Sequence, residues 1–282
     1  MKVGVIGAGT MGHGIATVCA TAGIDVVLAD ADAAALARGL AKIRASLDKA
    51  VEKGKLDPAG RDAALSRVSG GNLADAAANA DLVVEAVPER LALKQDLLRQ
   101  VEAVCGPACI LATNTSSLSV GQIGSALADP GRVIGTHFFN PVPVMALLEV
   151  VVSDATRPDV VERVQAFGLQ IGKELITVRD TPGFATSRLG VCLGMEAIRM
   201  VAQGVASAED IDKAMVLGYR HPVGPLRLTD LVGLDVRLAI GEYLSRELGN
   251  PAFEPPALMR EMVALGRLGQ KSGRGFYAWP TA

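Results

Sequence analysis

The chain has 282 residues, of which half are hydrophobic and 21% are charged, and its formal net charge is −2. This length allows two domains, each with a substantial core. The charge provides no overall basic excess for binding nucleic acid, and no apolar run is long enough to cross a bilayer. We therefore expect a globular protein that binds neither nucleic acid nor membrane.

Short apolar runs alternate with helix-like segments over the first part of the chain. The apolar runs are rich in β-branched residues, and the first of them ends at a cluster of glycines. Strands that alternate with helices predict a parallel sheet covered by helices on both faces. In chain order, the predicted elements are the strand Lys2–Ile6, the glycine turn Gly7–Gly12, the helix Met11–Ala22, the strand Asp25–Ala29, the helix Ala33–Lys53, and the strands Leu82–Ala86, Ile110–Ala112 and Val133–Ile134.

The pattern changes near Asp180–Gly183, where the sequence reads DTPG. Beyond this point strand signals fade, and Ala185–Gln203 has the pattern of one long helix. Ser207 and Asp210 resemble a capping box at the start of the next helix. We therefore predict a Rossmann-type α/β domain over residues 1–182, followed by an all-α domain over residues 183–282.

The four cysteines do not form a disulfide-dense pattern. Cys105 and Cys109 are four residues apart in CGPAC, without the partner cysteines or histidines of a zinc site. We expect no metal site, and reduced thiols in a cytoplasm-like compartment. The remaining two cysteines are Cys19 and Cys192.

The residues GAGTMG at positions 7–12 form a GxGxxG motif between a predicted strand and a predicted helix. In that context Gly7 allows the tight turn, Gly9 lets the backbone approach a pyrophosphate, and Gly12 lets the helix pack closely against the sheet. The amino end of the helix then faces the phosphate charge. The alternative is a glycine turn that binds nothing. We expect a dinucleotide to contact Gly7, Ala8, Gly9, Thr10, Met11 and Gly12.

Asp30 indicates which dinucleotide binds. It lies 23 residues after Gly7, at the end of the second predicted strand, where a carboxylate can accept hydrogen bonds from the adenosine ribose. The same charge would repel a 2′-phosphate, so we expect NAD rather than NADP. Asp32 is the competing candidate, but it fits better as the cap of the next helix. A simple turn role for Asp30 is the other interpretation.

A nicotinamide enzyme that oxidises an alcohol needs a base, and imidazole has a suitable pKa. His13 follows the glycine turn in a helix, and His221 precedes a proline in a turn of the helical domain, so packing explains both. His137 lies at the end of a predicted strand, where α/β sheets place their chemistry. A structural histidine at this position is an equally good interpretation of the pattern alone.

The stretch HFFNPVPVMALLEVV, residues 137–151, resembles the signature of the L-3-hydroxyacyl-CoA dehydrogenases, a family that includes the 3-hydroxybutyryl-CoA dehydrogenases. The family's other motifs follow the same order along the chain: NTSSL at 114–118, DTPGF at 180–184, MEAIR at 195–199, HPVGP at 221–225, DLVGLD at 230–235 and GRLGQKSGRGFY at 266–277. The resemblance therefore covers almost the whole chain.

This resemblance implies roles for individual residues. His137 matches the catalytic histidine, and Glu149 matches the glutamate that orients it. Their separation of 12 residues fits neither one helix face nor adjacent-strand pairing, so their contact should require the Pro141–Pro143 segment to fold back. Without the resemblance, Glu149 would be interpreted as a surface carboxylate.

The remaining matches concern cofactor and substrate. Ser116 matches a serine near both nicotinamide and substrate, and Asn140 matches a residue that contacts the same region; a turn hydroxyl and a pre-proline turn residue are the alternatives. Glu89, Lys94 and Lys271 match cofactor contacts; a helix-surface pair explains the spacing of Glu89 and Lys94 nearly as well, and a solvated lysine is the alternative for Lys271. Ser46 and Lys53 match coenzyme A contacts on the helix after Asp30, where a cation suits phosphate.

One position departs from the family pattern. The family's GFxxNR carries an asparagine that bonds the substrate carbonyl region, whereas this chain has Ser187 there. A serine hydroxyl can donate a hydrogen bond, but it is shorter than the amide. We expect Ser187 to contact substrate, with a backbone-bonding serine as the alternative.

The resemblance implies an NAD-dependent oxidation of an L-3-hydroxyacyl-CoA to the 3-ketoacyl-CoA, or the reverse reduction, on short acyl chains such as 3-hydroxybutyryl-CoA. The acyl-CoA is expected to bind in the cleft between the domains, and the helical domain is expected to form a homodimer. The rival functions are a dehydrogenase of a free 3-hydroxy acid and a dinucleotide-binding protein without activity.

Overall fold

The computed structural model describes residues 1–280. The chain forms two compact units: Met1–Thr181 is the first, and the second begins at Pro182. The chain therefore passes from one unit to the other inside the Asp180–Gly183 segment. Within the described residues, no helix is both long and apolar enough to span a membrane.

A single eight-stranded sheet forms the centre of the first unit, in the strand order β3-β2-β1-β4-β5-β6-β7-β8. All neighbouring strands are parallel except β6 and β7, which pair antiparallel. The loop 139–146 between them is too short for a crossover helix, so the chain returns beside β6 in the opposite direction. The expected all-parallel sheet is wrong at this pair. The strands are β1 (Lys2–Ile6), β2 (Asp25–Ala29), β3 (Val68–Gly71), β4 (Leu82–Glu85), β5 (Ile110–Thr113), β6 (Val133–Phe138), β7 (Leu147–Val152) and β8 (Glu174–Arg179).

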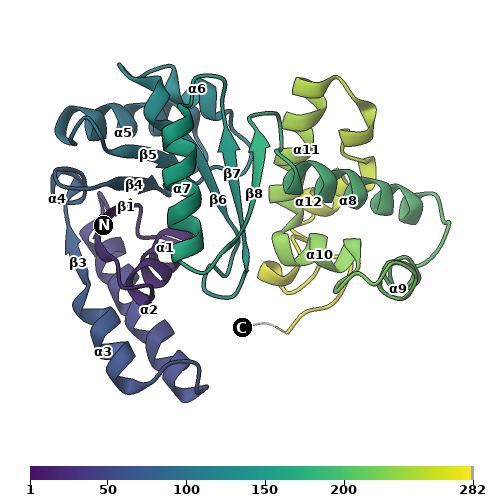
Figure 1. Cartoon of the computed structure of the whole chain (residues 1–282). Helices are drawn as coiled ribbons and strands as arrows, with labels where there is room; N and C mark the ends of the chain where they lie inside the picture. The colour runs from purple at the N-terminus through teal and green to yellow at the C-terminus, as the bar shows by residue number, and fades with distance from the viewer. Residues whose placement is uncertain (281–282) are drawn as a thin grey trace. The chain divides into compact units, whose positions relative to one another are not determined.

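Helices cover both faces of this sheet (Figure 1). On one face, α1 and α7 pack with the strands in an apolar core that includes Ile15, Val164 and Phe167. On the other face, α4, α5 and α6 contact the strands. The helices of this unit are α1 (Thr10–Thr21), α2 (Ala33–Glu52), α3 (Pro58–Ser66), α4 (Leu73–Ala77), α5 (Leu91–Val104), α6 (Val120–Gly124), a 3-10 turn at Pro130–Arg132, and α7 (Pro158–Gln170).

The strands β1, β2, β4 and β5 match their predicted bounds within one residue. Asp32 caps α2 as predicted, because its side chain accepts a hydrogen bond from the Ala34 amide at 2.8 Å. Three strands were missed. β3 contains two glycines, most side chains of the edge strand β8 are exposed, and β7 carries Glu149 within an apolar run. β3 and β8 lack the clear apolar pattern of a central strand, whereas in β7 the charged Glu149 interrupts an otherwise apolar run.

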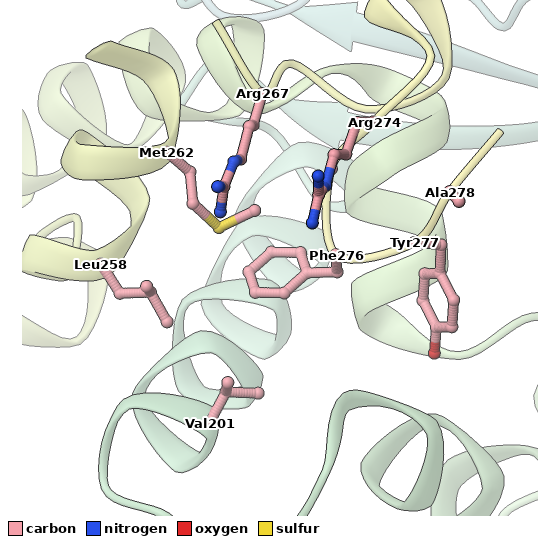
Figure 2. A pocket seen from close by; sticks show the side chains of 9 residues that line it. Val201, Leu258, Met262, Arg267, Arg274, Phe276, Tyr277 and Ala278 are labelled. Carbon is pink, nitrogen blue, oxygen red and sulfur yellow. The ribbon is translucent and has the colours of Figure 1, made fainter. Parts of the chain in front are cut away.

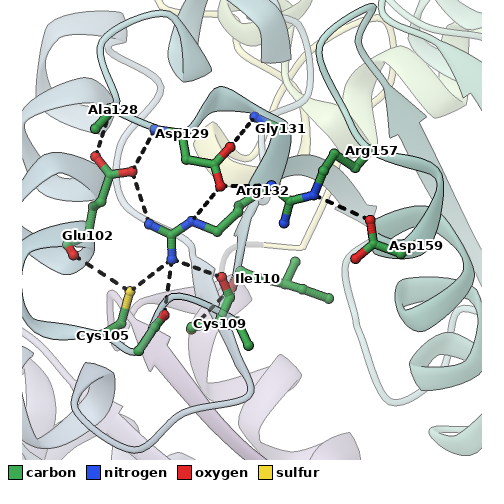
Figure 3. Close-up of polar contacts among 12 residues, drawn as sticks. Glu102, Cys105, Cys109, Ile110, Ala128, Asp129, Gly131, Arg132, Arg157 and Asp159 are labelled. Atoms are coloured by element: carbon green, nitrogen blue, oxygen red, sulfur yellow. Dashed lines mark hydrogen bonds and ion pairs between the residues drawn. The ribbon is translucent and has the colours of Figure 1, made fainter.

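The buried guanidinium of Arg132 ties the start of β6 to the end of α5 (Figure 3). Arg132 is 5% exposed, and it donates to Glu102 Oε1 at 3.0 Å and to the Gly106 carbonyl at 3.1 Å. Two loop amides, one of them from Asp129, also donate to Glu102. Burial raises the pKa of Glu102, but these amides and Arg132 outweigh it, so the pKa lies below its usual value. The cluster therefore stabilises the N-terminal ends of β5 and β6.

The second unit is helical, and its regular β structure within the described residues is limited to two isolated bridges. The buried carboxylate of Asp230 accepts bonds from the Phe276 and Tyr277 amides and from Trp279 Nε1, which fixes the C-terminal segment onto α10. The Rossmann-like sheet followed by a helical unit confirms the predicted fold class. The helices are α8 (Thr186–Ala202), α9 (Ala208–Gly218), α10 (Pro225–Val232), α11 (Leu234–Leu248) and α12 (Ala257–Ala264), with 3-10 turns at Pro251–Phe253 and Gln270–Ser272.

Ser207 caps α9, as the sequence predicts. Its hydroxyl accepts a hydrogen bond from the Asp210 amide at 3.1 Å. It also donates to the Asp210 carboxylate at 2.9 Å. The Asp210 side chain therefore bonds the hydroxyl of Ser207, whereas in a full capping box it would accept from the Ser207 amide.

Candidate active site

The carboxyl ends of β1, β2, β4, β5 and β6 lie at one edge of the sheet, because these strands are parallel and in register. Polar and glycine residues gather where these strands end. Gly7 follows β1, Asp30 follows β2, Glu85 ends β4, Asn114 follows β5, and His137 lies near the end of β6. This is the edge at which open α/β sheets bind ligands.

The glycine turn between β1 and α1 depends on two glycines. Gly7 has a φ of +103°, and its amide donates to the Ala29 carbonyl at 2.8 Å. A Cβ at Gly12 would lie 1.7 Å from the Gly7 carbonyl oxygen, so only glycine fits there. Gly12 is therefore required by the turn itself, in addition to the helix packing that the sequence predicts.

Gly9 leaves the amino end of α1 open. A Cβ at Gly9 would meet no atom within 4 Å, and Gly9 provides no side-chain cap for the helix. Thr10 and Met11 form the first turn of α1, so their amides point along the helix axis toward this open region. Uncapped amides and the helix dipole together favour an anion, and these residues therefore fit a pyrophosphate.

Asp30 holds the glycine turn and the start of α2 together. Its Oδ2 accepts from the Ala8 amide at 2.8 Å, and its Oδ1 accepts from the Asp32 amide at 2.9 Å. Asp32 in turn caps α2. The carboxylate of Asp30 is thus fixed next to the glycine turn, whereas that of Asp32 is engaged by the helix.

His137 and Glu149 face each other across β6 and β7. They are direct partners in the antiparallel register, and His137 Nδ1 lies 2.6 Å from Glu149 Oε2. His137 is 5% exposed and Glu149 is fully buried. A carboxylate at Nδ1 favours the tautomer with the proton on Nδ1, which makes Nε2 the basic nitrogen. The pair is therefore suited to accepting a proton at Nε2.

This geometry corrects two expectations. The two residues pair as neighbours on adjacent strands, although their separation of 12 residues argues against adjacent-strand pairing. The loop 139–146 turns the chain so that β7 runs back beside β6, and the contact follows from strand pairing. Glu149 is also not a surface carboxylate, because β7 lies between β6 and β8 inside the sheet.

Glu89 organises the loop that contains Ser116. The Glu89 Oε1 atom accepts from the Thr115 hydroxyl, from the Ser116 amide at 2.9 Å and from the Ser117 amide at 3.1 Å. Burial raises the pKa of Glu89, but the Lys94 ammonium and these three donors outweigh it, so the pKa lies below its usual value. Glu89 is therefore ionised at neutral pH and fixes the backbone of the Ser116 loop.

Lys94 is completely buried, so the alternative of an exposed helix pair is wrong for it. Its Nζ lies 2.6 Å from Glu85 Oε1 and 3.5 Å from Glu89 Oε2. Glu85 is fully buried too, and it also accepts from the Thr113 hydroxyl at 2.8 Å. The sequence reasoning missed Glu85, although an acidic residue that ends an apolar run was a signal for it.

The other predicted residues lie in separate places. Asn140 is exposed in the loop 139–146. Ser46 lies on α2 and Lys53 directly after it, seven residues on and so on the same helix face. Ser187 lies in the first turn of α8 and Lys271 in the second unit, where its ammonium pairs with Asp235 at 2.6 Å. The structure thus gathers the glycine turn, Asp30, Glu89, Ser116 and His137 at the sheet edge, whereas Ser46 and Lys53 lie along α2 and at its C-terminal end.

The second unit contains a separate pocket of about 400 Å³ (Figure 2). Val201, Leu258, Met262 and Phe276 form apolar walls. Two arginine side chains are directed toward it. None of the predicted site residues lines this pocket, so it is distinct from the site at the sheet edge. The arginines are Arg267 and Arg274.

Residues 1–280 contain no group of three or more histidine, cysteine or acidic side chains arranged to hold a metal ion. The four cysteines are free thiols.

Comparison with known proteins identifies a family along both units. The model described as the NAD binding domain of 3-hydroxyacyl-CoA dehydrogenase matches residues 2–181. The model of the C-terminal domain of the same enzyme matches residues 183–279.

Individual relatives are similar over nearly the whole chain. A probable 3-hydroxybutyryl-CoA dehydrogenase of Deinococcus radiodurans is 44% identical, covering 99% of this chain and 100% of the relative. The 3-hydroxybutyryl-CoA dehydrogenase of Mycobacterium tuberculosis is 41% identical, covering 99% and 98%. The solved structure of (S)-3-hydroxybutyryl-CoA dehydrogenase from Ralstonia eutropha has a TM-score of 0.95 at 43% identity, and 99% of each chain is covered.

Proposed function

The chain belongs to the 3-hydroxyacyl-CoA dehydrogenase family, and on this premise we propose that it interconverts an L-3-hydroxyacyl-CoA and the 3-ketoacyl-CoA with NAD as cofactor. The names of its relatives support short acyl chains such as 3-hydroxybutyryl-CoA. The observation that carries the proposal is the buried His137–Glu149 pair, at the same sheet edge as the glycine turn.

In the oxidative direction, His137 Nε2 takes the proton from the 3-hydroxyl group of the substrate. The Glu149 carboxylate keeps the proton on Nδ1 and stabilises the imidazolium that forms. NAD, when bound, supplies the acceptor for the hydride that leaves C3. In the reductive direction, His137 returns the proton to the 3-keto oxygen.

The residues of the first unit fit this cofactor. The pyrophosphate would lie on Gly7 to Gly12, where α1 begins without a side-chain cap. The fixed carboxylate of Asp30 would accept hydrogen bonds from the adenosine ribose. Glu89 and Lys94 would act chiefly by holding Ser116 in place near nicotinamide and substrate, because Lys94 has no exposed surface. Lys271 is a further proposed contact of the cofactor.

Replacing Asp30 by Asn is expected to raise the KM for NAD about tenfold and to reduce the preference for NAD over NADP. The amide keeps one oxygen for the Ala8 amide but removes the charge that binds ribose hydroxyls and repels a 2′-phosphate. Steady-state kinetics with both cofactors measures the change. Asp32→Asn is the matched control, because asparagine also caps helices. A changed preference in that control, with none in Asp30→Asn, would reverse the assignment.

The substrate contacts are proposed from the family match. Ser46 and Lys53 would bind the coenzyme A portion, since they share one face of α2. Asn140 and Ser116 would contact the acyl portion and the nicotinamide. Ser187, in place of the family's asparagine, would donate its hydroxyl near the thioester carbonyl.

The division of labour between the units is part of the same proposal. Residues 1–182 would bind the dinucleotide, and residues 183–282 would contribute to substrate binding and form a homodimer. Large apolar side chains that are more than 70% exposed in the second unit support a homodimer: Leu189, Leu217 and Tyr219. Free thiols are consistent with a reducing, cytoplasm-like compartment.

One assay tests the function. The purified protein is mixed with NADH and acetoacetyl-CoA, and the nicotinamide absorbance is followed. Oxidation of NADH is the expected result. Turnover of a free 3-keto acid without turnover of the thioester would contradict the proposal and favour the free-acid dehydrogenase. Binding of NADH with no turnover of either substrate would favour a dinucleotide-binding protein without activity.

A further inference from the structure

The loop 139–146 connects the two strands that carry His137 and Glu149, and it contains Asn140. Its own backbone makes few bonds: the Val144 and Met145 amides both donate to the Pro141 carbonyl, at 2.9 and 3.0 Å. The side chain of Val144 is 71% exposed. The loop therefore depends on contacts with other segments of the chain to keep one conformation.

Lys173 supplies such a contact. It lies between α7 and β8, and it is 7% exposed. Its Nζ donates to the Val142 carbonyl at 2.5 Å and to the Met145 carbonyl at 2.6 Å. The ammonium thus joins the middle of the loop to its far end, from a segment about 30 residues further along the chain.

The ammonium of Lys173 has no carboxylate partner among residues 1–280. Its neighbour Cys19 is fully buried, and burial raises the pKa of that thiol to about 12, so it supplies no negative charge at neutral pH. Burial likewise lowers the pKa of Lys173. A lone buried cation is costly, and an apolar side chain would fill the same space without that cost. We therefore infer that the role of the charged ammonium is to bond the two loop carbonyls.

The loop also packs against α1. Val142 is 1% exposed, and a Cβ at Gly14 would lie 2.9 Å from the Val142 Cβ. Glycine at position 14 thus allows the helix that follows the dinucleotide turn to approach the loop closely. The loop is therefore held by two contacts, the packing of Val142 against α1 and the Lys173 ammonium, and neither contact involves His137 or Glu149.

We propose that Lys173 is a positioning residue for substrate binding: it holds the loop 139–146 in the conformation that presents Asn140 to the acyl thioester. The inference rests on the proposed function. The catalytic pair is fixed separately, by the pairing of β6 with β7 and of β7 with β8. Loss of the ammonium should therefore lower the fraction of molecules whose loop is in the substrate-binding conformation, and should leave the proton transfer by His137 unchanged.

The test replaces Lys173 by Met, which keeps the length of the side chain and removes the charge and its donors. If about one molecule in ten then has the competent loop, the KM for acetoacetyl-CoA rises about tenfold. The kcat at saturating substrate and its pH profile stay within about twofold, because bound substrate selects the competent loop. Lys173→Gln, whose amide can donate to one carbonyl, should give an intermediate KM.

Val164→Ala is the matched control, because Val164 is a fully buried residue of α7 that makes no polar contact with the loop. It should lower thermal stability without raising the KM. An unchanged KM in Lys173→Met would overturn the proposal, as would an equal rise in Val164→Ala at the same loss of Tm.

Hydrogen exchange of the wild-type protein provides a second measurement that needs no variant. The Val144 and Met145 amides should be protected; exchange at the rate of an unstructured peptide would show that the loop is not held and would also overturn the proposal. If the wild-type protein fails to reduce acetoacetyl-CoA, the proposed function fails, and comparing the exchange of these two amides between the wild-type protein and Lys173→Met still decides whether Lys173 holds the loop.

Discussion

His137→Gln is expected to lower kcat by about 10²- to 10⁴-fold and to leave the affinity for NADH within about twofold. A glutamine amide can still donate to Glu149, so the packing between β6 and β7 is kept. The amide cannot accept or release a proton at neutral pH, so the 3-hydroxyl group loses its general base and the 3-keto oxygen loses its general acid. Stopped-flow kinetics with acetoacetyl-CoA measures kcat, and NADH fluorescence titration measures affinity.

Glu149→Gln tests the other half of the pair. It removes the charge that stabilises the imidazolium, so kcat should also fall, and the double variant should be little worse than His137→Gln alone, because the two residues act as a unit. His221→Gln is the control, since His221 lies in the second unit and outside the pair. Near-normal turnover in His137→Gln would remove this histidine from the mechanism.

The features that the sequence predicted well are local ones. The glycine turn, the strands around it and the Asp32 cap of α2 depend on residues within a few positions of each other. Each has its own chemical signature, such as glycine for a tight turn or aspartate for a helix cap. Asp30 follows from the same short segment, because it ends the strand after the turn.

The pairing of His137 with Glu149 could be expected only through the family resemblance. Spacing alone argued against it, since nothing in residues 139–146 identifies a connection between antiparallel strands. The partner of a strand is decided by the whole sheet, in which β7 lies between β6 and β8. Long-range strand pairing is therefore the information that the local pattern lacks.

Buried charges were the hardest feature to predict. Charged side chains on a helix are usually exposed, so Lys94 suggested a surface pair, and Lys173 and Arg132 gave no signal at all. Each is stabilised in the interior by partners on other elements: Lys94 bonds Glu85, Lys173 bonds loop carbonyls, and Arg132 bonds Glu102. The sequence shows that a residue is charged, but it does not show which hydrogen-bond partners surround the charge in the folded protein.

Lys94→Met is expected to destabilise the protein by about 3–5 kcal/mol, because it leaves the fully buried Glu85 carboxylate without its counter-charge. Urea unfolding followed by circular dichroism measures the loss. The control Lys42→Met, at an exposed position of α2, should change the free energy of unfolding by less than about 0.5 kcal/mol.

The cause of that loss is separable from packing. In the double variant Glu85→Gln/Lys94→Met neither charge remains, so it should regain at least half of the lost stability, since replacing both partners of a buried ion pair costs far less than removing one. If the double variant is as unstable as Lys94→Met, the lost stability comes from altered packing and not from the unpaired Glu85 charge. Recovery of stability without recovery of activity would show, in addition, that Lys94 is needed to hold Glu89 and the Ser116 loop.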